Sequence, residues 1–412
     1  MIGERRALEE EATELLRGLV ERPTVNPPGD TREVVAFLAD RARAAGLAVE
    51  VVGDAEQQSV LLVSGVAGPT FVLNAHLDTV PVVDASDWEY PPFEGRVVDG
   101  RMYGRGAADN KAGVAAAFMA LLAAHREGLT KDFRLCGMFV ADEEMGGAKG
   151  TGAVVASGAL ERLDVAAALV CDGAGLESGA WGVRVASKGM ARLGIKVEGV
   201  SAHAARPEQG RNAVLALADV LLALHGSDVL PSLSHPTLGA PSLVAGTTVQ
   251  GGTSPNAVPG SAEATVDCRL VPGVDLPSVV ARCEALASSV AARWSCTSQV
   301  SVLLYLPPLD TDVDQPVVKH TLAAIAEVTG QAPEVRGLVG GNDAKYFIER
   351  GVPTLLGLSP SDAATSRTHG RNENVSIRNV VTASQIYGTA IRKWAAEFHL
   401  PTSSVRTGRV QR

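Results

Sequence analysis

Three apolar segments of strand length each end abruptly at residues that can bind metals or move protons. The segments and their polar endings are 71–74 with His76 and Asp78, 133–141 with Glu143 and Glu144, and 165–171 with Asp172. A helix-like segment, 111–127, separates the first two. Strands that alternate with helices predict an α/β fold around a sheet with substantial parallel character. Ligands of such sheets bind beyond the carboxyl ends of the strands, where these polar residues would lie.

The middle of the chain has a different arrangement of strand-like and helix-like segments. It contains two strand-like segments and two amphipathic helices, namely strands 183–197 and 262–270 and helices 212–225 and 276–294. This set is compatible with a small α+β sandwich inserted into a larger domain. Outside the insert we expect helices over 7–20, 315–328, 344–350 and 380–398, and strands over 60–63 and 354–358. The expected domain boundaries are 1–185 for the first part of the main domain, 186–306 for the insert and 307–412 for the second part.

The composition excludes several classes of partner. The 412 residues carry a net charge of −9, which argues against a nucleic-acid backbone or an anionic membrane as the main partner. The longest apolar run, 112–124, is too short to span a bilayer. Five scattered cysteines without a C-x-x-C spacing argue against a disulfide framework. The first residues lack the apolar core of a secretion signal, so we expect a cytoplasmic protein.

Each polar motif has two interpretations when taken alone. His76 and Asp78 would face the same side of a strand, so His76 could bind a metal while Asp78 orients its ring, or the pair could be a local hydrogen bond. Asp109 follows a glycine-rich turn that nearly matches G-x-G-x-x-G, but a carboxylate there would repel a pyrophosphate. Asp109 therefore suits a metal ligand better, or a carboxylate favoured by a helix N-terminus. Glu143 and Glu144 could divide proton transfer and metal binding between them, or lie on a solvated surface.

Taken together, these residues point to a metal site. The candidate ligands are of the types that hold divalent ions: His76, Asp109, Glu144, Asp172 and, in a later loop that could equally be polar surface, His369. The first four are spaced by 33, 35 and 28 residues, each about one βα unit. Successive strand ends would then deliver them to one cleft, where two ions bridged by a carboxylate could activate a shared water.

The ordered set of motifs resembles a family of zinc amidohydrolases. The family includes acetylornithine deacetylase, succinyl-diaminopimelate desuccinylase, aminoacylase and glutamate carboxypeptidase, and the resemblance covers about residues 70–375. It implies that Asp109 bridges two zinc ions (Co or Mn are possible substitutes), with His76 and Asp172 at one ion and Glu144 and His369 at the other. It also implies a cis peptide bond after Asp109. Glu143 would be the general base and then the acid, and Asp78 would support His76.

The insert resembles the lid and dimerisation domain of the same family. His203 would polarise the scissile carbonyl, either from the closing lid or across a homodimer. Asn256 and Arg269 would hold the α-carboxylate of the substrate, which suits the forked donors of Arg, although Arg269 could instead form an ordinary ion pair. Gly341 would join these substrate-binding residues. Two departures bear on the pocket: Asn342 stands where relatives usually carry Thr, and Asp172 where many have Glu.

The resemblance implies hydrolysis of an amide bond in an N-acyl amino acid or a related small molecule. A dipeptidase, a carboxypeptidase and an amidohydrolase that trims an aminoacyl group in metabolite biosynthesis are alternatives within the class. A non-catalytic metal-binding protein on the same fold is an alternative of another class, as is a nucleotide-binding α/β protein. The sequence has neither a complete glycine fingerprint nor G-x-x-x-x-G-K, which the last of these requires.

Overall fold

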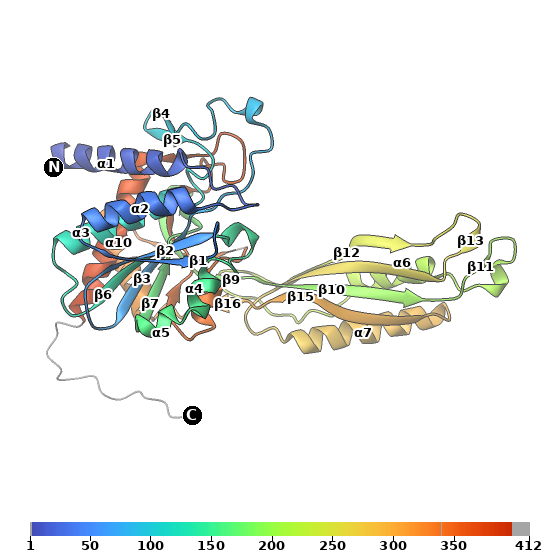
Figure 1. The fold of residues 1–412 in the computed structure, drawn as a ribbon. Coiled ribbons are helices and arrows are strands. Elements are labelled where there is room, and N and C mark those ends of the chain that lie inside the picture. The colour runs from blue at the N-terminus through green and yellow to red at the C-terminus, as the bar shows by residue number, and fades with distance from the viewer. Residues whose placement is uncertain (1, 339, 398–412) are drawn as a thin grey trace. The chain divides into compact units, whose positions relative to one another are not determined.

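A computed structural model describes residues 2–338 and 340–397 of the chain. The contacts divide it into two compact units (Figure 1). Unit 1 comprises residues 1–185, 311–336 and 342–412, and unit 2 comprises residues 186–310 and 337–341. The second boundary thus falls after Asp310, four residues beyond the expected one, and a short later segment joins unit 2.

Unit 1 is built around a six-stranded mixed sheet. The strand order is β1-β2-β6-β3-β7-β18, and the three pairings β6-β3, β3-β7 and β7-β18 are parallel. The strands are β1 (Ala48–Gly53), β2 (Gln58–Ser64), β3 (Thr70–His76), β6 (Arg134–Val140), β7 (Val165–Val170) and β18 (Thr354–Leu355). This arrangement confirms the expected central sheet, which is mixed and largely parallel.

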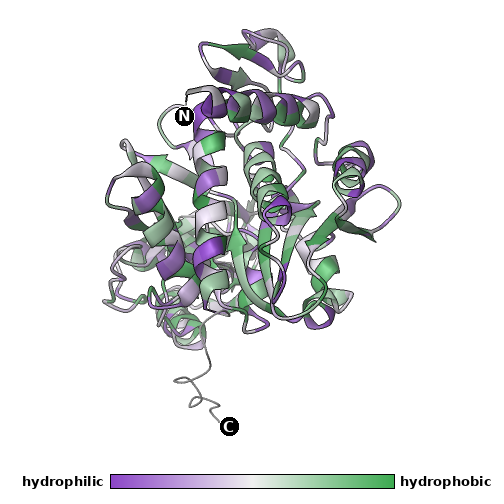
Figure 2. Cartoon of the chain, turned by 90° about the vertical axis from the view of Figure 1, so that its left-hand side faces the viewer, coloured by the Kyte–Doolittle hydropathy of each residue, from purple (hydrophilic) through white to green (hydrophobic). Residues whose placement is uncertain are grey.

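Helices cover both faces of this sheet, which is why its central strands read as continuous apolar runs. In β3, Phe71 and Leu73 pack into one core and Val72 into the other. The larger core lies against α1 (Ile2–Val20), α2 (Arg32–Ala44), α3 (Lys111–Arg126), α8 (Pro316–Thr329) and α10 (Ile377–Ala396). The smaller core lies against α4 (Thr151–Ala156), α5 (Ala159–Arg162) and α9 (Ala344–Ile348). Figure 2 shows largely hydrophobic strands surrounded by helices that alternate between hydrophilic and hydrophobic residues.

Smaller sheets complete the described part of the chain. One has the order β16-β9-β8-β19, with β17 also paired to β9, and another has the order β20-β5-β4. Their strands are β4 (Arg96–Val98), β5 (Arg101–Tyr103), β8 (Ala174–Glu177), β9 (Ala180–Ser187), β16 (Leu309–Asp310), β17 (Glu334–Leu338), β19 (Ser359–Asp362) and β20 (Asn374–Ser376). The β20-β5 pairing joins the segment before α10 to the segment before α3.

Unit 2 is an antiparallel sheet with helices on one face. The strand order is β12-β14-β10-β15, and α6 and α7 pack on the alternate residues that point to one side, such as Leu193 and Ile195 of β10. The elements are β10 (Gly189–Glu198), β12 (Ser242–Gly251), β14 (Ser261–Leu270), β15 (Thr297–Leu306), α6 (Ala213–His225) and α7 (Leu276–Arg293). A two-stranded ribbon pairs β11 (Ala202–His203) with β13 (Ala257–Val258).

Most expected elements are present, and the differences have local causes. The strand expected over 183–197 is two strands, because the extended pairing is interrupted between Ser187 and Gly189. Asn212 is the N-cap of α6 rather than its first residue, since its side chain accepts from the backbone N–H groups of Val214 and Leu215. The helix expected over 380–398 is α10, which begins at Ile377 and ends at Ala396; residue 398 lies outside the described residues.

Two further expectations concern the chain as a whole. The apolar run 112–124 lies within α3 and is buried in the core of unit 1. None of the helices in the described ranges combines the length and the apolarity that crossing a bilayer requires. All five cysteines are buried and free. The compartment in which the protein works stays a prediction.

Candidate metal centre

The five expected ligands lie together at one end of the central sheet of unit 1. His76 ends β3, Glu144 lies in the short 3-10 helix that follows β6, and Asp172 follows β7. These three strands are neighbours and run parallel, so their carboxyl ends meet at one edge. Asp109 arrives from the turn before α3, and His369 from the loop before β20.

The ligand atoms form two groups that share one residue. His76, Asp109 and Asp172 form one group, and Asp109, Glu144 and His369 form the other, with the atoms of each group within 4.8 Å of one another. Asp109 Oδ1 lies 3.0 Å from His76 Nε2, and its Oδ2 lies 3.2 Å from His369 Nε2. The two carboxylate oxygens of Asp109 therefore face different groups, the arrangement that a bridging ligand requires.

The close approach of α3 to β7 brings Asp109 beside Asp172. Gly113 lies on the first turn of α3, and a Cβ at this position would collide with the carbonyl oxygen of Cys171 and the side chain of Asn110. Only glycine allows the helix to begin this close to the end of the strand. The expected cis peptide bond is present between Asp109 and Asn110.

The titration behaviour of the cluster reflects crowded carboxylates in a buried place. Burial disfavours the charged form of His76, but its hydrogen bonds to Asp109 and Asp78 outweigh burial and hold its pKa well above the usual value. Hydrogen bonds to Asp109 and Glu144 raise the pKa of His369 to about 10. Burial raises the pKa of Asp172, and the neighbouring charge of Asp109 adds to the effect. Such an excess of negative charge over positive charge is relieved by bound cations.

The donor set fits a pair of divalent ions. Glu144 Oε1 is buried and lies 3.3 Å from His369 Nε2, so that both ligand atoms face the same small space. Two imidazoles and three carboxylates match the ligand preferences of zinc, and carboxylate-rich sites also admit manganese or cobalt. Buried carboxylates gathered this closely are costly unless cations or protons compensate their charge.

Asp78 connects the strand that carries His76 to the loop that carries the two glutamates. His76 Nδ1 lies 3.0 Å from the backbone oxygen of Asp78 and 3.5 Å from its Oδ1. The fully buried carboxylate accepts hydrogen bonds from the backbone N–H groups of Glu143 and Glu144 at 3.0 and 3.2 Å, and from the Asn26 amide at 2.9 Å. Asp78 thus positions both the imidazole and the acidic pair, and the contribution of Asn26 is not visible in the sequence motifs.

Glu143 lies beside the cluster in a partly buried position. Burial raises the pKa of Glu143 well above its usual value, and the charges of Asp172, Asp343 and Glu144 add to this, while His76 opposes it. A carboxyl group with a raised pKa can exchange a proton near neutral pH, as a general base that later acts as an acid must.

An internal ion pair, absent from the sequence-based site, holds the Asp109 turn in shape. The fully buried Glu373 carboxylate accepts a hydrogen bond from Arg105 Nη1 at 2.6 Å and others from the backbone N–H groups of Gly106, Ala108 and Asp109 at 3.1, 2.9 and 2.9 Å. Arg105 Nη2 also donates to the backbone oxygen of His369 at 3.3 Å. The pair therefore joins the two loops that supply Asp109 and His369. A signal was available in the opposite charges of Arg105 in the Asp109 motif and Glu373 in the His369 motif.

The expected substrate-binding residues lie in unit 2. His203 Nδ1 accepts from the backbone N–H of Ala205, and the Asn256 backbone oxygen accepts from the N–H of Ala204, so His203 and Asn256 are neighbours at the β11-β13 ribbon. Arg269 lies near the opposite end of β14 and donates to Asp267 Oδ1 at 2.8 Å, which is the ordinary ion pair considered above. Ser261, at the other end of β14, is eight residues away, or about 26 Å at ~3.3 Å per residue.

Gly341 and Asn342 differ in their surroundings. Gly341 is exposed, and a Cβ there would meet no atom within 4 Å. Asn342 is buried; its amide donates to the Leu356 backbone oxygen at 2.7 Å, and its oxygen accepts from the N–H of Ala344 at 3.1 Å. The side chain of Asn342 is thereby engaged in holding the start of α9, so these contacts do not support the expected effect on the substrate pocket.

Comparison of the sequence with known proteins gives a consistent result. The model of the family described as peptidase family M20/M25/M40 matches residues 72–393. The succinyl-diaminopimelate desuccinylase of Caulobacter vibrioides is 29% identical over 392 residues, which cover 93% of this chain and 96% of that protein. The enzyme of the same name from Alkalilimnicola ehrlichii is 30% identical, covering 93% and 99%.

Solved structures share the fold at lower identity. Aminopeptidase PepT from Bacillus cereus superposes with a TM-score of 0.75 at 20% identity, covering 94% of this chain and 99% of that one. The YXEP protein of Bacillus subtilis, described as a dinuclear metal-binding peptidase, has a TM-score of 0.71 at 17% identity, covering 94% and 98%. Human carnosine dipeptidase 1 has a TM-score of 0.67 at 19% identity, covering 96% and 98%.

Proposed function

Because this chain belongs to peptidase family M20/M25/M40 and is a metal-dependent hydrolase of amide bonds, we propose that it removes the acyl group from a small N-acyl amino acid. The observation that carries the proposal is the pair of ligand groups that share Asp109. Curated relatives that align over 93% of the chain are named as desuccinylases, which favours an N-acyl amino acid, and an N-succinyl one in particular, over a longer peptide.

In this proposal the cluster holds two zinc ions. His76 and Asp172 would hold one ion, Glu144 and His369 would hold the other, and both groups would share Asp109. Bound there, the ions would lower the pKa of a water toward about 7 and polarise the scissile carbonyl. The fit of the donor set and the buried Oε1 of Glu144 beside His369 Nε2 support this role.

The residues around the ions divide the proton chemistry. Glu143 takes the proton from the attacking water and returns it to the leaving nitrogen, so that the amine departs as a neutral group. The raised pKa of Glu143 supports this double role. Asp78 keeps the backbone of Glu143 and the ring of His76 in position through its hydrogen bonds. His203 donates to the oxygen on which negative charge develops.

We propose that His203 and Asn256 act from a second copy of the chain. Arg269 and Gly341 would hold the substrate carboxylate, and Asn256 would have to reach the same group. Within one copy of unit 2, Ser261 lies about 26 Å along β14 from Arg269 at ~3.3 Å per residue, and Asn256 belongs to the ribbon that precedes Ser261, so one small substrate would not contact both. A homodimer in which each copy lends its β11-β13 ribbon to the other removes this conflict.

Unit 2 offers a surface suited to such a dimer. Strand β12 is an edge of the sheet, and an edge strand presents unpaired backbone groups to another chain. Val244 and Val249 on this strand are each 56% exposed, and Leu222 on the adjacent α6 is 73% exposed. An apolar edge of this kind is typical of an interface.

The test combines metal analysis with a substrate panel. The purified protein should contain about two equivalents of zinc, and thorough chelation should abolish turnover that added zinc restores. The panel consists of N-succinyl, N-acetyl and N-aminoacyl derivatives of the same amino acids. Faster hydrolysis of the N-succinyl compounds supports the proposal. Preference for the N-aminoacyl compounds would instead establish a dipeptidase, and turnover that survives metal removal would refute the metal mechanism.

A further inference from the structure

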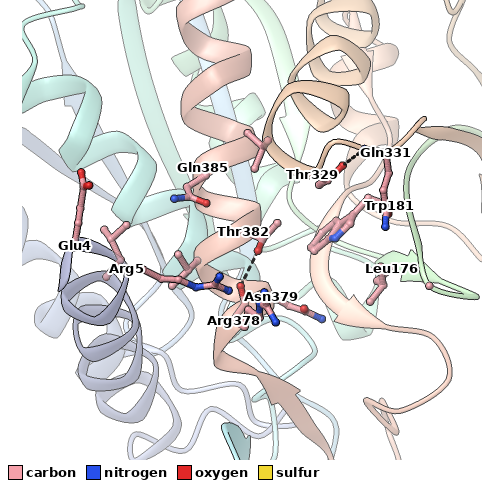
Figure 3. Close-up of a pocket in the computed structure, with 14 residues that line it drawn as sticks. Glu4, Arg5, Leu176, Trp181, Thr329, Gln331, Arg378, Asn379, Thr382 and Gln385 are labelled. Atoms are coloured by element: carbon pink, nitrogen blue, oxygen red, sulfur yellow. Dashed lines mark hydrogen bonds between the residues drawn. The ribbon is translucent and has the colours of Figure 1, made fainter. Parts of the chain in front are cut away.

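Unit 1 contains a cavity that the metal cluster does not use. It measures about 650 Å³ and is lined by α1, α8, the first turns of α10 and the β8-β9 hairpin (Figure 3). This volume lies within the usual range for small-molecule pockets. None of the five expected metal ligands lines it. Its role is therefore independent of the function proposed above.

One side of the cavity carries two arginines. Arg378 lies on the first turn of α10, and its side chain is exposed. Among the residues the structure describes, this side chain has no hydrogen-bond or ion-pair partner. Arg5 uses its Nε to bind Glu9 at 3.2 Å, which leaves both Nη groups available. Figure 3 shows Arg5 extended from α1 toward the turn that carries Arg378 and Asn379, whereas the carboxylate of Glu4 points away from them.

The opposite wall carries a buried indole. Trp181 is only 6% exposed, and Figure 3 shows its ring reaching into the cavity. Its N–H has no hydrogen-bond partner within the described ranges. Leu176 and Val381 add apolar surface, and Thr382 lies between the arginines and the indole. The indole nitrogen itself is open to solvent at the cavity, so its N–H can donate to a molecule bound there.

From this arrangement we infer a second ligand site, which binds a small organic anion whose carboxylate or phosphate is attached to an apolar ring. The anionic group lies between Arg5 and Arg378, because two guanidinium groups facing one space are stabilised by an anion that accepts from both. The ring packs against Trp181 and Leu176, where it is removed from water. Carboxylate and phosphate share this chemistry, and the experiment below separates them.

The site can be observed directly through its tryptophan. The chain has four tryptophans, so protein labelled with 5-fluorotryptophan gives four fluorine resonances, and the Trp181→Phe variant identifies the one from Trp181. The zinc-loaded protein is titrated with benzoate, with phenyl phosphate and with benzamide, the neutral analogue of benzoate. We expect benzoate or phenyl phosphate to shift the Trp181 resonance saturably, and the tighter of the two identifies the preferred anion. Benzamide should bind at least about tenfold more weakly, because it lacks the charge.

A matched pair of variants tests the arginine. Arg378→Gln should weaken the preferred anion about tenfold, whereas Arg43→Gln, which removes a surface charge outside the cavity, should leave the affinity unchanged. Both variants should keep the melting temperature and turnover of the parent, which shows that they fold. The inference is overturned if no probe shifts the Trp181 resonance saturably, if benzamide binds as tightly as benzoate, or if Arg378→Gln has no effect. If the probes bind at the metal cluster alone, the Trp181 resonance stays in place, and the inference is also overturned.

Discussion

Replacing Glu373 should both destabilise the protein and loosen its hold on metal. The Glu373 carboxylate is fully buried and accepts four hydrogen bonds, of which two reach each oxygen. In Glu373→Gln, one oxygen becomes an NH₂ group that faces two donors, and Arg105 is left buried beside a neutral partner. Breaking a buried ion pair by removing one charge typically costs about 3–5 kcal/mol, which agrees with the loss of two charge-assisted bonds at ~1.5–3 kcal/mol each.

The effect on metal binding follows from the position of the lost bonds. The N–H of Asp109 is one of the four donors, and Arg105 also holds the backbone oxygen of His369. The substitution therefore frees the two loops that supply Asp109 and His369, the proposed bridging and terminal ligands. Losing such supporting contacts commonly weakens a metal site by about 10–100-fold.

Two measurements check this prediction. Urea unfolding of the metal-stripped protein gives the free energy of unfolding, and competition with a chelator of known affinity gives the zinc affinity. Glu127→Gln is a suitable control, because Glu127 forms an exposed pair with Arg392, and such pairs contribute about 0–1 kcal/mol. If Glu373→Gln unfolds within about 1 kcal/mol of the control and binds zinc as tightly, the reasoning is wrong.

Three further predictions test the mechanism. Glu143→Ala should keep its two metals, measured by elemental analysis, but lose about 10²–10⁴-fold in turnover, and nearly full activity would remove Glu143 from its role. If His203 acts across a dimer, mixing His203→Ala with Glu143→Ala protein should restore activity in the heterodimer, whereas verified heterodimers without activity would leave only action within one copy. Burial raises the pKa of Asp343 to about 7 from the usual 3.8, so the folded state binds more protons than the unfolded state between these values. The unfolding free energy of the metal-stripped protein should therefore fall as pH rises from about 4 to 7, and Asp343→Asn should flatten this slope; an unchanged slope in urea unfolding would contradict the assignment.

The sequence by itself predicted the central sheet and the strand ends that carry the candidate metal ligands, because both follow from local patterns. An apolar run such as 133–141 that stops at Glu143 and Glu144 indicates a buried strand and its end within a few residues of chain. Parallel neighbours necessarily bring such ends to one edge, so convergence of His76, Glu144 and Asp172 follows from the fold class. The pairing of His369 with this edge came from the family resemblance.

Tertiary structure decided the interactions that join distant segments. Glu373 and its partner Arg105 are 268 residues apart, and no local pattern reveals which buried carboxylate meets which donor. The same holds for Asn26 and Asp78, and for Trp181 and Arg378, which line one cavity. Such contacts depend on how helices and loops pack, because burial and partner choice are properties of the assembled core, whereas periodicity and strand endings are properties of the chain.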